Sequence, residues 1–92
     1  MIGADTVVKR ALDARVRQIG ERQLVARGRD VLELNELAAV IWRLADGSRS
    51  AAEIGQAVAA EYDVPPEAAL ADVLEFLTEL ADARFLTVRP AP

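Results

Sequence analysis

Cysteine and histidine are both absent from the 92 residues, and lysine occurs only as Lys9. Without cysteine the chain has no disulfide framework and no thiolate nucleophile. Imidazole and thiolate are the ligands that transition metals prefer, and imidazole is the usual base beside a hydroxyl nucleophile. We therefore expect no enzyme activity and no cofactor.

Long apolar segments are also absent. The N-terminal residues MIGADTVVKR lack the apolar region of a signal peptide, and no run approaches the roughly 20 residues of a membrane span. Apolar residues nevertheless make up 52% of the chain, too many for a disordered protein. These features predict one soluble, cytoplasmic domain with no membrane partner.

Charge is distributed unevenly along the chain. Residues 1–34 carry seven basic and five acidic groups, whereas residues 35–92 carry four basic and ten acidic groups. Such a surface can be simply solvated, with both signs interspersed. It can also indicate a mildly basic N-terminal part and an acidic helical part with different partners.

Residues 14–34 have the pattern of three short strands. RVRQIG, RQLVA and RDVLEL are separated by turn residues, with Gly20 in the first turn and Gly28 in the second. In the third strand Leu32 and Leu34 would share one face, because side chains alternate along a strand. The pattern predicts an antiparallel meander.

Three helices are predicted after the strands. Asn35 is a good cap for the first, and Gly47 suits the left-handed position after its end. Ser50 and Glu53 have the spacing of a capping box at the start of the second helix. The third is expected from about Pro66 to Ala83. Its buried stripe comprises Leu70, Val73, Leu74, Leu77, Leu80 and Ala81.

This order predicts an α+β fold with a winged-helix-turn-helix-like arrangement, in which an N-terminal three-stranded antiparallel sheet is followed by three helices. Residues 14–88 would form the domain. Residues 1–13 would be an arm, either frayed or forming a first strand, and residues 89–92 a flexible tail.

Acidic side chains recur along the third predicted helix at Asp72, Glu75, Glu79 and Asp82. Paired carboxylates can act as acid and base, but this spacing is typical of the solvated stripe of an amphipathic helix. As a recognition helix it would be repelled by phosphates. Nucleic-acid binding would have to use the strands, through Arg15, Arg17, Arg27 and Arg29.

Two motifs carry a resemblance to a known family. Leu-Asn-Glu followed by Ala-Ala-x-Ile-Trp-x-Leu-x-Asp-Gly occupies residues 34–47, and Asp-Val-Leu-x-Phe-Leu-x-x-Leu occupies residues 72–80. In this order and spacing, residues 14–88 resemble the PqqD-like family, also called RiPP recognition elements. Two details depart from the family pattern: Val-Pro-Pro replaces a capping residue before the third helix, and Arg84-Phe85 replaces Gly-Leu.

The resemblance implies a non-catalytic adaptor. Such domains bind the leader segment of a ribosomally made precursor peptide and present it to a tailoring enzyme, often a radical SAM enzyme. The leader adds as an antiparallel strand to the third strand, beside the third helix. The residues that this implies for the site are Arg29, Asp30, Val31, Leu32, Glu33, Leu34, Asp72, Val73, Phe76, Leu77 and Leu80.

Several of these residues have a second interpretation. Most of the aliphatic candidates fit the hydrophobic core better than a contact with the leader, whereas Phe76 lies off the centre of its helix stripe. The residues that favour the core are Leu32, Leu34, Val73, Leu77 and Leu80. A winged-helix nucleic-acid-binding regulator is the alternative function, although no nucleic-acid partner is expected. A subunit whose acidic third helix docks onto an enzyme is a third option. An open strand edge allows either a monomer or a strand-swapped dimer.

Overall fold

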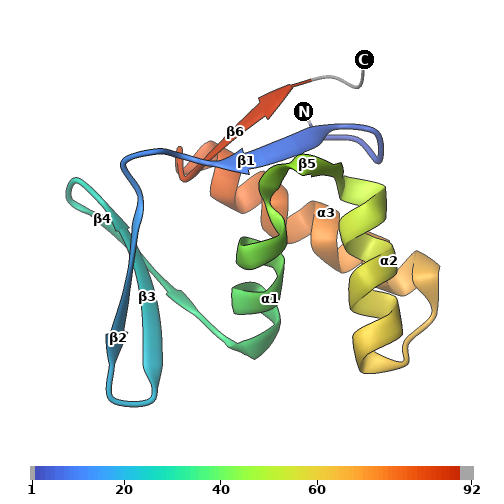
Figure 1. The fold of residues 1–92 in the computed structure, drawn as a ribbon, viewed down its shortest axis with the longest axis horizontal. Helices are drawn as coiled ribbons and strands as arrows, with labels where there is room; N and C mark the ends of the chain where they lie inside the picture. The colour runs from blue at the N-terminus through green and yellow to red at the C-terminus, as the bar shows by residue number, and fades with distance from the viewer. Residues whose placement is uncertain (1, 90–92) are drawn as a thin grey trace.

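The computed structural model describes residues 2–89, which form two small sheets and three helices (Figure 1). The elements in chain order are β1 (Val7–Arg10), β2 (Arg15–Ile19), β3 (Arg22–Arg27), β4 (Asp30–Leu34), α1 (Glu36–Leu44), β5 (Asp46–Ser50), α2 (Ala51–Tyr62), α3 (Pro66–Asp82) and β6 (Leu86–Arg89). Residues 90–92 of the predicted tail lie outside the described part.

The predicted meander is the sheet with strand order β2-β3-β4. Both of its turns have two residues, and both contain a glycine at positive φ, +61° at Gly20 and +60° at Gly28. Glycine suits these positions because it has no Cβ to clash with the backbone. Arg29, predicted as part of the third strand, lies instead in the second turn, and β4 begins at Asp30.

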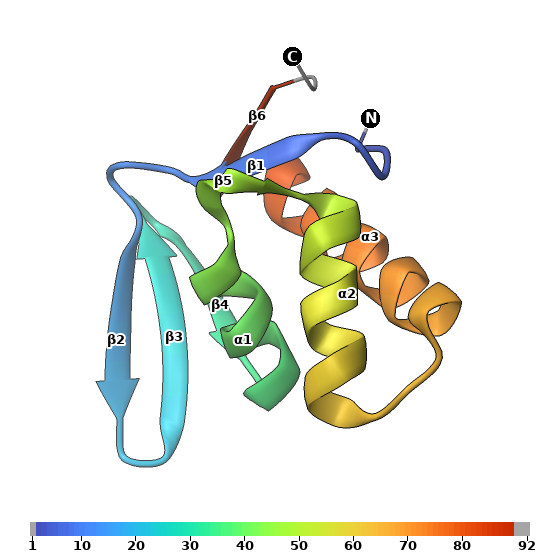
Figure 2. The same ribbon diagram turned by 45° about the vertical axis from the view of Figure 1, so that its right-hand side comes forward.

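The prediction of one sheet followed by three helices was wrong in one respect. The structure contains a second antiparallel sheet that was not predicted, with the strand order β5-β1-β6. Of the two alternatives for residues 1–13, the structure has the strand β1, and Val8 within it is 0% exposed. β5 forms around Gly47, which was expected to follow the end of the first helix. β6 ends at Arg89, the first residue of the predicted flexible tail. β1 lies between β5 and β6 in Figures 1 and 2.

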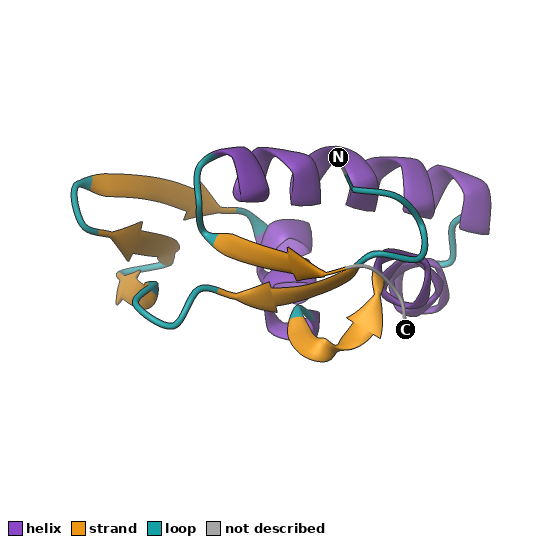
Figure 3. Ribbon diagram, turned by 90° about the horizontal axis from the view of Figure 1, so that it is seen from above, coloured by secondary structure: helices purple, strands orange, loops and turns teal. Residues whose placement is uncertain are grey.

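Each strand of this second sheet has only four or five residues, and its partners are far away in the sequence. Short segments of this kind have too little alternation for a pattern to be recognised. Figure 3 shows the strands of the two sheets as separate groups.

The end of α1 also differs from the prediction. Ala45 caps the helix, and Gly47 lies within β5 at a φ of +87°. Arg10 of β1 adds a side-chain cap: its Nη1 donates to the carbonyl oxygens of Trp42, at 2.9 Å, and Arg43, at 2.8 Å. A guanidinium satisfies the last carbonyl groups of a helix well and complements its dipole.

The predicted starts of the helices are confirmed in their hydrogen bonds. The Asn35 Oδ1 accepts from the Ala38 N–H at 2.8 Å. Ser50 and Glu53 form the reciprocal capping box, with bonds of 2.9 and 3.2 Å. α3 begins at Pro66 without a side-chain cap, as the Val-Pro-Pro sequence implies.

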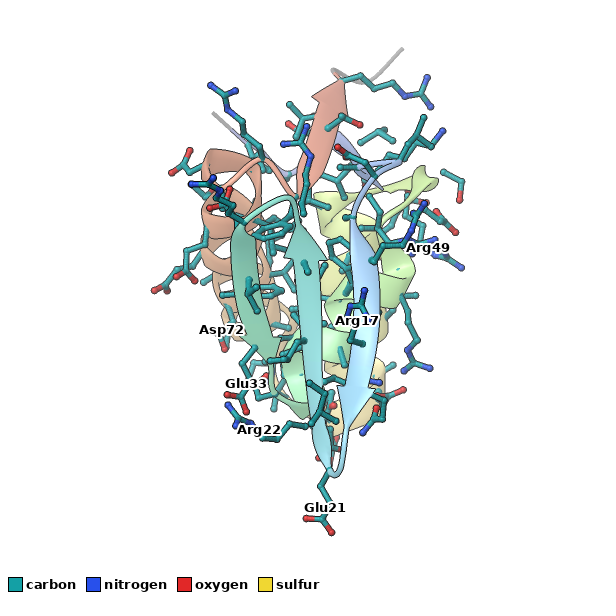
Figure 4. The ribbon with its side chains drawn as sticks, turned by 90° about the vertical axis from the view of Figure 1, so that its left-hand side faces the viewer. Arg17, Glu21, Arg22, Glu33, Arg49 and Asp72 are labelled. Carbon is teal, nitrogen blue, oxygen red and sulfur yellow. The ribbon has the colours of Figure 1, made fainter. Side chains whose placement is uncertain are left out.

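The helices cover one face of the β2–β4 sheet, and its opposite face is open. Val25 and Leu34 point inward and are buried. Figure 4 looks onto the open face, with the strands in front and the helices behind. No helix within residues 2–89 is long and apolar enough to cross a membrane.

Candidate functional site

A cleft of about 350 Å³ lies between β4 and α3, with α1 as its floor. β4 and α1 are consecutive in the sequence and are joined through the Asn35 cap, whereas α3 comes from a separate part of the chain. The lining residues are Leu32, Glu33, Asn35, Leu37, Ala38, Ile41, Asp72, Phe76 and Glu79.

β4 forms one wall of the cleft and is an edge strand. It pairs with β3 on one side, and no strand within residues 2–89 pairs with its other side. Val31 is 59% exposed, Leu32 is half-buried at the cleft, and Leu34 belongs to the core at 5% exposure. A strand edge has unpaired N–H and C=O groups that can pair with an added chain.

α3 forms the opposite wall with one face of the helix. Asp72, Phe76 and Glu79 line the cleft, whereas Val73, Leu77 and Leu80 are each 0% exposed in the core. Of the predicted site residues, the structure therefore brings Leu32, Glu33, Asp72 and Phe76 together around the cleft. Arg29, Asp30 and Val31 flank it without lining it.

Five lining residues were absent from the predicted set: Asn35, Leu37, Ala38, Ile41 and Glu79. Leu37 and Ile41 belong to the apolar stripe of α1, and nothing in the sequence separates a cleft floor from a core. Glu79 could have been found, because it is three residues after Phe76 and seven after Asp72, on the same helix face.

The charged groups of the cleft are all acidic. Glu33 forms an ion pair with Arg22 at 2.7 Å, and the hydrogen bond from Arg22 holds the pKa of this carboxyl below its usual value. Among the described residues, Asp72 and Glu79 form no ion pair. Figure 4 shows Asp72 and Glu33 on the same flank of the sheet. No basic residue lines the cleft.

Metal binding finds no support in the described residues. No group of three or more His, Cys, Asp or Glu side chains within residues 2–89 is placed to hold a metal ion.

The arginines that could meet phosphates lie elsewhere on the molecule. Arg17 projects from β2 on the open face of the sheet (Figure 4). Arg27 pairs with Asp13 at 2.7 Å, and its hydrogen bond lowers the pKa of the Asp13 carboxyl. Arg17 and Arg27 thus lie on the β2–β4 sheet and do not line the cleft, whose charged residues are Glu33, Asp72 and Glu79.

Comparison with known proteins identifies one family. Residues 21–86 match the family model described as coenzyme PQQ synthesis protein D (PqqD). The chain is 42% identical over 57 residues to a PqqA binding protein of Bradyrhizobium diazoefficiens, covering 62% of this chain and 55% of the relative. A PqqA binding protein of Xanthomonas oryzae pv. oryzae is 43% identical over 56 residues, 61% of each chain. The match thus spans less than two thirds of either relative.

Solved structures share the fold. The NMR structure of the PqqD truncation of Methylobacterium extorquens PqqCD, described as a functional, stand-alone RiPP recognition element, superposes with a TM-score of 0.81 at 24% identity over 95% of both chains. TbiB1 in complex with the TbiA(beta) leader peptide gives 0.73 at 24% identity, over 85% of this chain and 93% of that one. PqqD from Xanthomonas campestris gives 0.61 at 29% identity, over 84% and 88%.

Proposed function

Because the chain belongs to the PqqD family, we propose that it is a non-catalytic adaptor that binds the leader segment of a ribosomally made precursor peptide. The observation that carries this proposal is the open edge of β4 beside an apolar cleft. Two relatives are named as PqqA binding proteins, and a protein of the same fold was solved in complex with a leader peptide.

The leader would bind by adding a strand to β4. The turn at Gly28 and Arg29 is closed by the pair Arg27 and Asp30. In a two-residue hairpin the closing pair exchanges hydrogen bonds, and every second pair along the ladder does the same. We therefore expect the Leu32 backbone to bond to β3 and the N–H and C=O of Val31 and Glu33 to face the leader. Main-chain bonds would give affinity and the cleft would select side chains.

A tailoring enzyme would be the second partner. In the proteins that the sequence resembles, the adaptor presents the precursor to such an enzyme, often a radical SAM enzyme. In this proposal, α1–α3 correspond to a helix-turn-helix-like trio and the β2–β4 sheet to its wing. The site residues on β4 and α3 bind the leader, while the buried Leu34, Val73, Leu77 and Leu80 support the walls from within.

A nucleic-acid-binding regulator is the alternative. It is favoured by one observation, namely that Arg15 and Arg17 are exposed on β2 and form no ion pair among the described residues. The acidic face of α3 opposes it, because phosphates would be repelled there.

An amide NMR titration separates the two functions. The labelled protein would be titrated with synthetic leader segments of short peptides encoded beside its gene, and separately with a DNA duplex at moderate salt. Leader-dependent shifts in residues 30–34 and 72–79 support the adaptor. DNA-dependent shifts at Arg15 and Arg17 without any leader-dependent shift would support the regulator and contradict the adaptor.

The Val31→Pro variant tests strand addition directly. Proline removes one N–H from the open edge, where it is tolerated because the bonds to β3 remain. Loss of one main-chain hydrogen bond should weaken leader binding by about threefold to tenfold. Val31→Thr keeps the N–H and serves as the matched control. Equal affinity of the two folded variants would argue against strand addition to β4.

A further inference from the structure

Apolar side chains and carboxylates together line the cleft. The large apolar lining residues are Leu32, Leu37, Ile41 and Phe76, and the carboxylates are Glu33, Asp72 and Glu79. Glu33 is already paired with Arg22, but the two α3 carboxylates have no ion-pair partner among residues 2–89. The cleft thus has an apolar lining and an uncompensated acidic wall.

The acidic groups have a regular position relative to Phe76. Asp72 lies four residues before it and Glu79 three residues after it, about 6 and 4.5 Å along the helix axis. A carboxylate therefore stands roughly one helical turn from the aromatic ring on each side. In an added strand, side chains on the same face recur every second residue, about 6.6–6.8 Å apart. The Asp72 spacing of about 6 Å is close to this repeat, and the Glu79 spacing of about 4.5 Å is shorter.

We propose that this cleft selects peptides in which a lysine or arginine lies two positions from the apolar residue that contacts Phe76. The inference rests on the proposed function and specifies which leaders it would accept. The basic side chain lays its methylene stem along the apolar lining and places its charged end at Asp72 or Glu79. An acidic residue at the same position meets like charges and binds more weakly.

The size of the effect follows from the exposure of the groups. Asp72 and Glu79 are exposed, so each pair with a peptide cation contributes modestly, about twofold to fivefold in affinity. The contribution decreases with salt, because exposed charges are screened. Apolar contacts and main-chain bonds carry the remainder of the affinity, and these are insensitive to the sign of the peptide charge.

The test uses a displayed random-peptide library of extended seven-residue segments, sorted against the full chain. The cleft variant carries Asp72→Asn with Glu79→Gln, which keeps size and hydrogen bonding but removes both charges. The matched control carries Glu75→Gln with Asp82→Asn, which removes two charges from α3 at positions that do not line the cleft.

The wild-type protein and the control should enrich lysine or arginine two positions from an apolar residue. The cleft variant should enrich the apolar residue alone. Apolar enrichment without a basic preference in the wild-type protein, or a basic preference that survives in the cleft variant, would overturn the inference while leaving the adaptor function intact. Recovery of no peptide at all would contradict the adaptor function, and the inference with it.

Peptide affinity measured at two salt concentrations provides a second readout. A recovered peptide that carries the basic residue should bind the wild-type protein more weakly as the salt concentration rises, and its norleucine analogue should not. A salt dependence that is equal for the two peptides would also overturn the inference.

Discussion

At the scale of single residues, the position of a side chain around α3 decides what it does. Successive residues turn by about 100°, so Val73, Leu77 and Leu80 share the buried face, and Asp72 and Phe76 share the neighbouring face at the cleft. The sequence pattern predicted that Phe76 lies off the stripe. It could not show that the neighbouring face opens into a cleft, because that depends on how far β4 lies from α3.

Gly55 is a second residue whose role is defined by its neighbours. It lies on α2, and a Cβ built there would come within 3.2 Å of the Leu70 Cα on α3. Backbone atoms do not move aside as a flexible side chain does, so the absence of a side chain allows the two helices to pack closely.

We expect Gly55→Val to lower the free energy of unfolding by about 1–3 kcal/mol, the usual cost of overpacking. Urea denaturation monitored by circular dichroism measures it. Ala57→Val, at an exposed position of the same helix, should cost no more than about 0.7 kcal/mol through helix propensity. Equal denaturation midpoints for the two variants would contradict the close approach of α2 and α3.

At the scale of elements, β5 is held partly by a carboxylate. The Asp46 Oδ1 accepts hydrogen bonds from the Ser48 Oγ at 2.7 Å and the Ser48 N–H at 3.0 Å, and Arg49 pairs with the other oxygen. The bonds from Ser48, more than the charge of Arg49, lower the pKa of Asp46 to about 2 from 3.8.

A depressed pKa in the folded state means that the carboxylate stabilises the fold above its unfolded pKa. This stabilisation is present above about pH 4 and is lost as the pH falls toward 2. Asp46→Asn should therefore unfold more easily than the wild-type chain at pH 7, and the difference should shrink between pH 4 and 2. Thermal unfolding across this pH range measures both effects.

Glu21→Gln provides the control for this prediction. Glu21 lies at the tip of the β2–β3 hairpin (Figure 4) and lacks that set of hydrogen bonds. A difference between Asp46→Asn and the wild-type chain that stays constant from pH 7 to 2 would contradict the proposed role of the Asp46 carboxylate.

The elements differ in how well the sequence predicts them. α1 and α2 carry capping residues and apolar stripes, which act over a few residues and can be read directly from the chain. The β2–β4 meander has glycine turns and alternation. The strands of the other sheet depend on partners that are far away in the sequence. Gly47 was predicted to follow the end of the first helix, but it lies at positive φ within β5.

At the scale of the whole molecule, β1 pairs with one strand from the middle of the chain, β5, and with one from the end of the described part, β6. Val7 pairs with Ser50 and Arg89, and Val8 pairs with Val88. Without β1, neither β5 nor β6 would have a strand beside it, and α1 would lose the cap that Arg10 provides. The predicted domain boundary at residue 14 would separate this strand from the rest.

A chain that begins at residue 14 should therefore be less stable than the full chain. Burial of Val8 alone contributes about 1.5–3 kcal/mol, a large share of the roughly 5–15 kcal/mol typical of a domain. We expect a lower melting temperature and a broader transition in calorimetry. Adding a synthetic peptide of residues 1–13 should restore part of the stability. An unchanged melting temperature would show that residues 14–92 form an independent unit.

The central position of β1 also determines the order in which the fold can form during synthesis. β1 is made near the start of the chain and β6 near the end of the described part, so their pairing must wait until almost all of residues 2–89 have been translated. The β2–β4 meander needs only neighbouring residues and can form early, since local contacts require little loop closure. The edge of β4 therefore forms before α3 has been made. In a nascent chain this edge lacks the α3 wall that forms the cleft beside it in the finished protein.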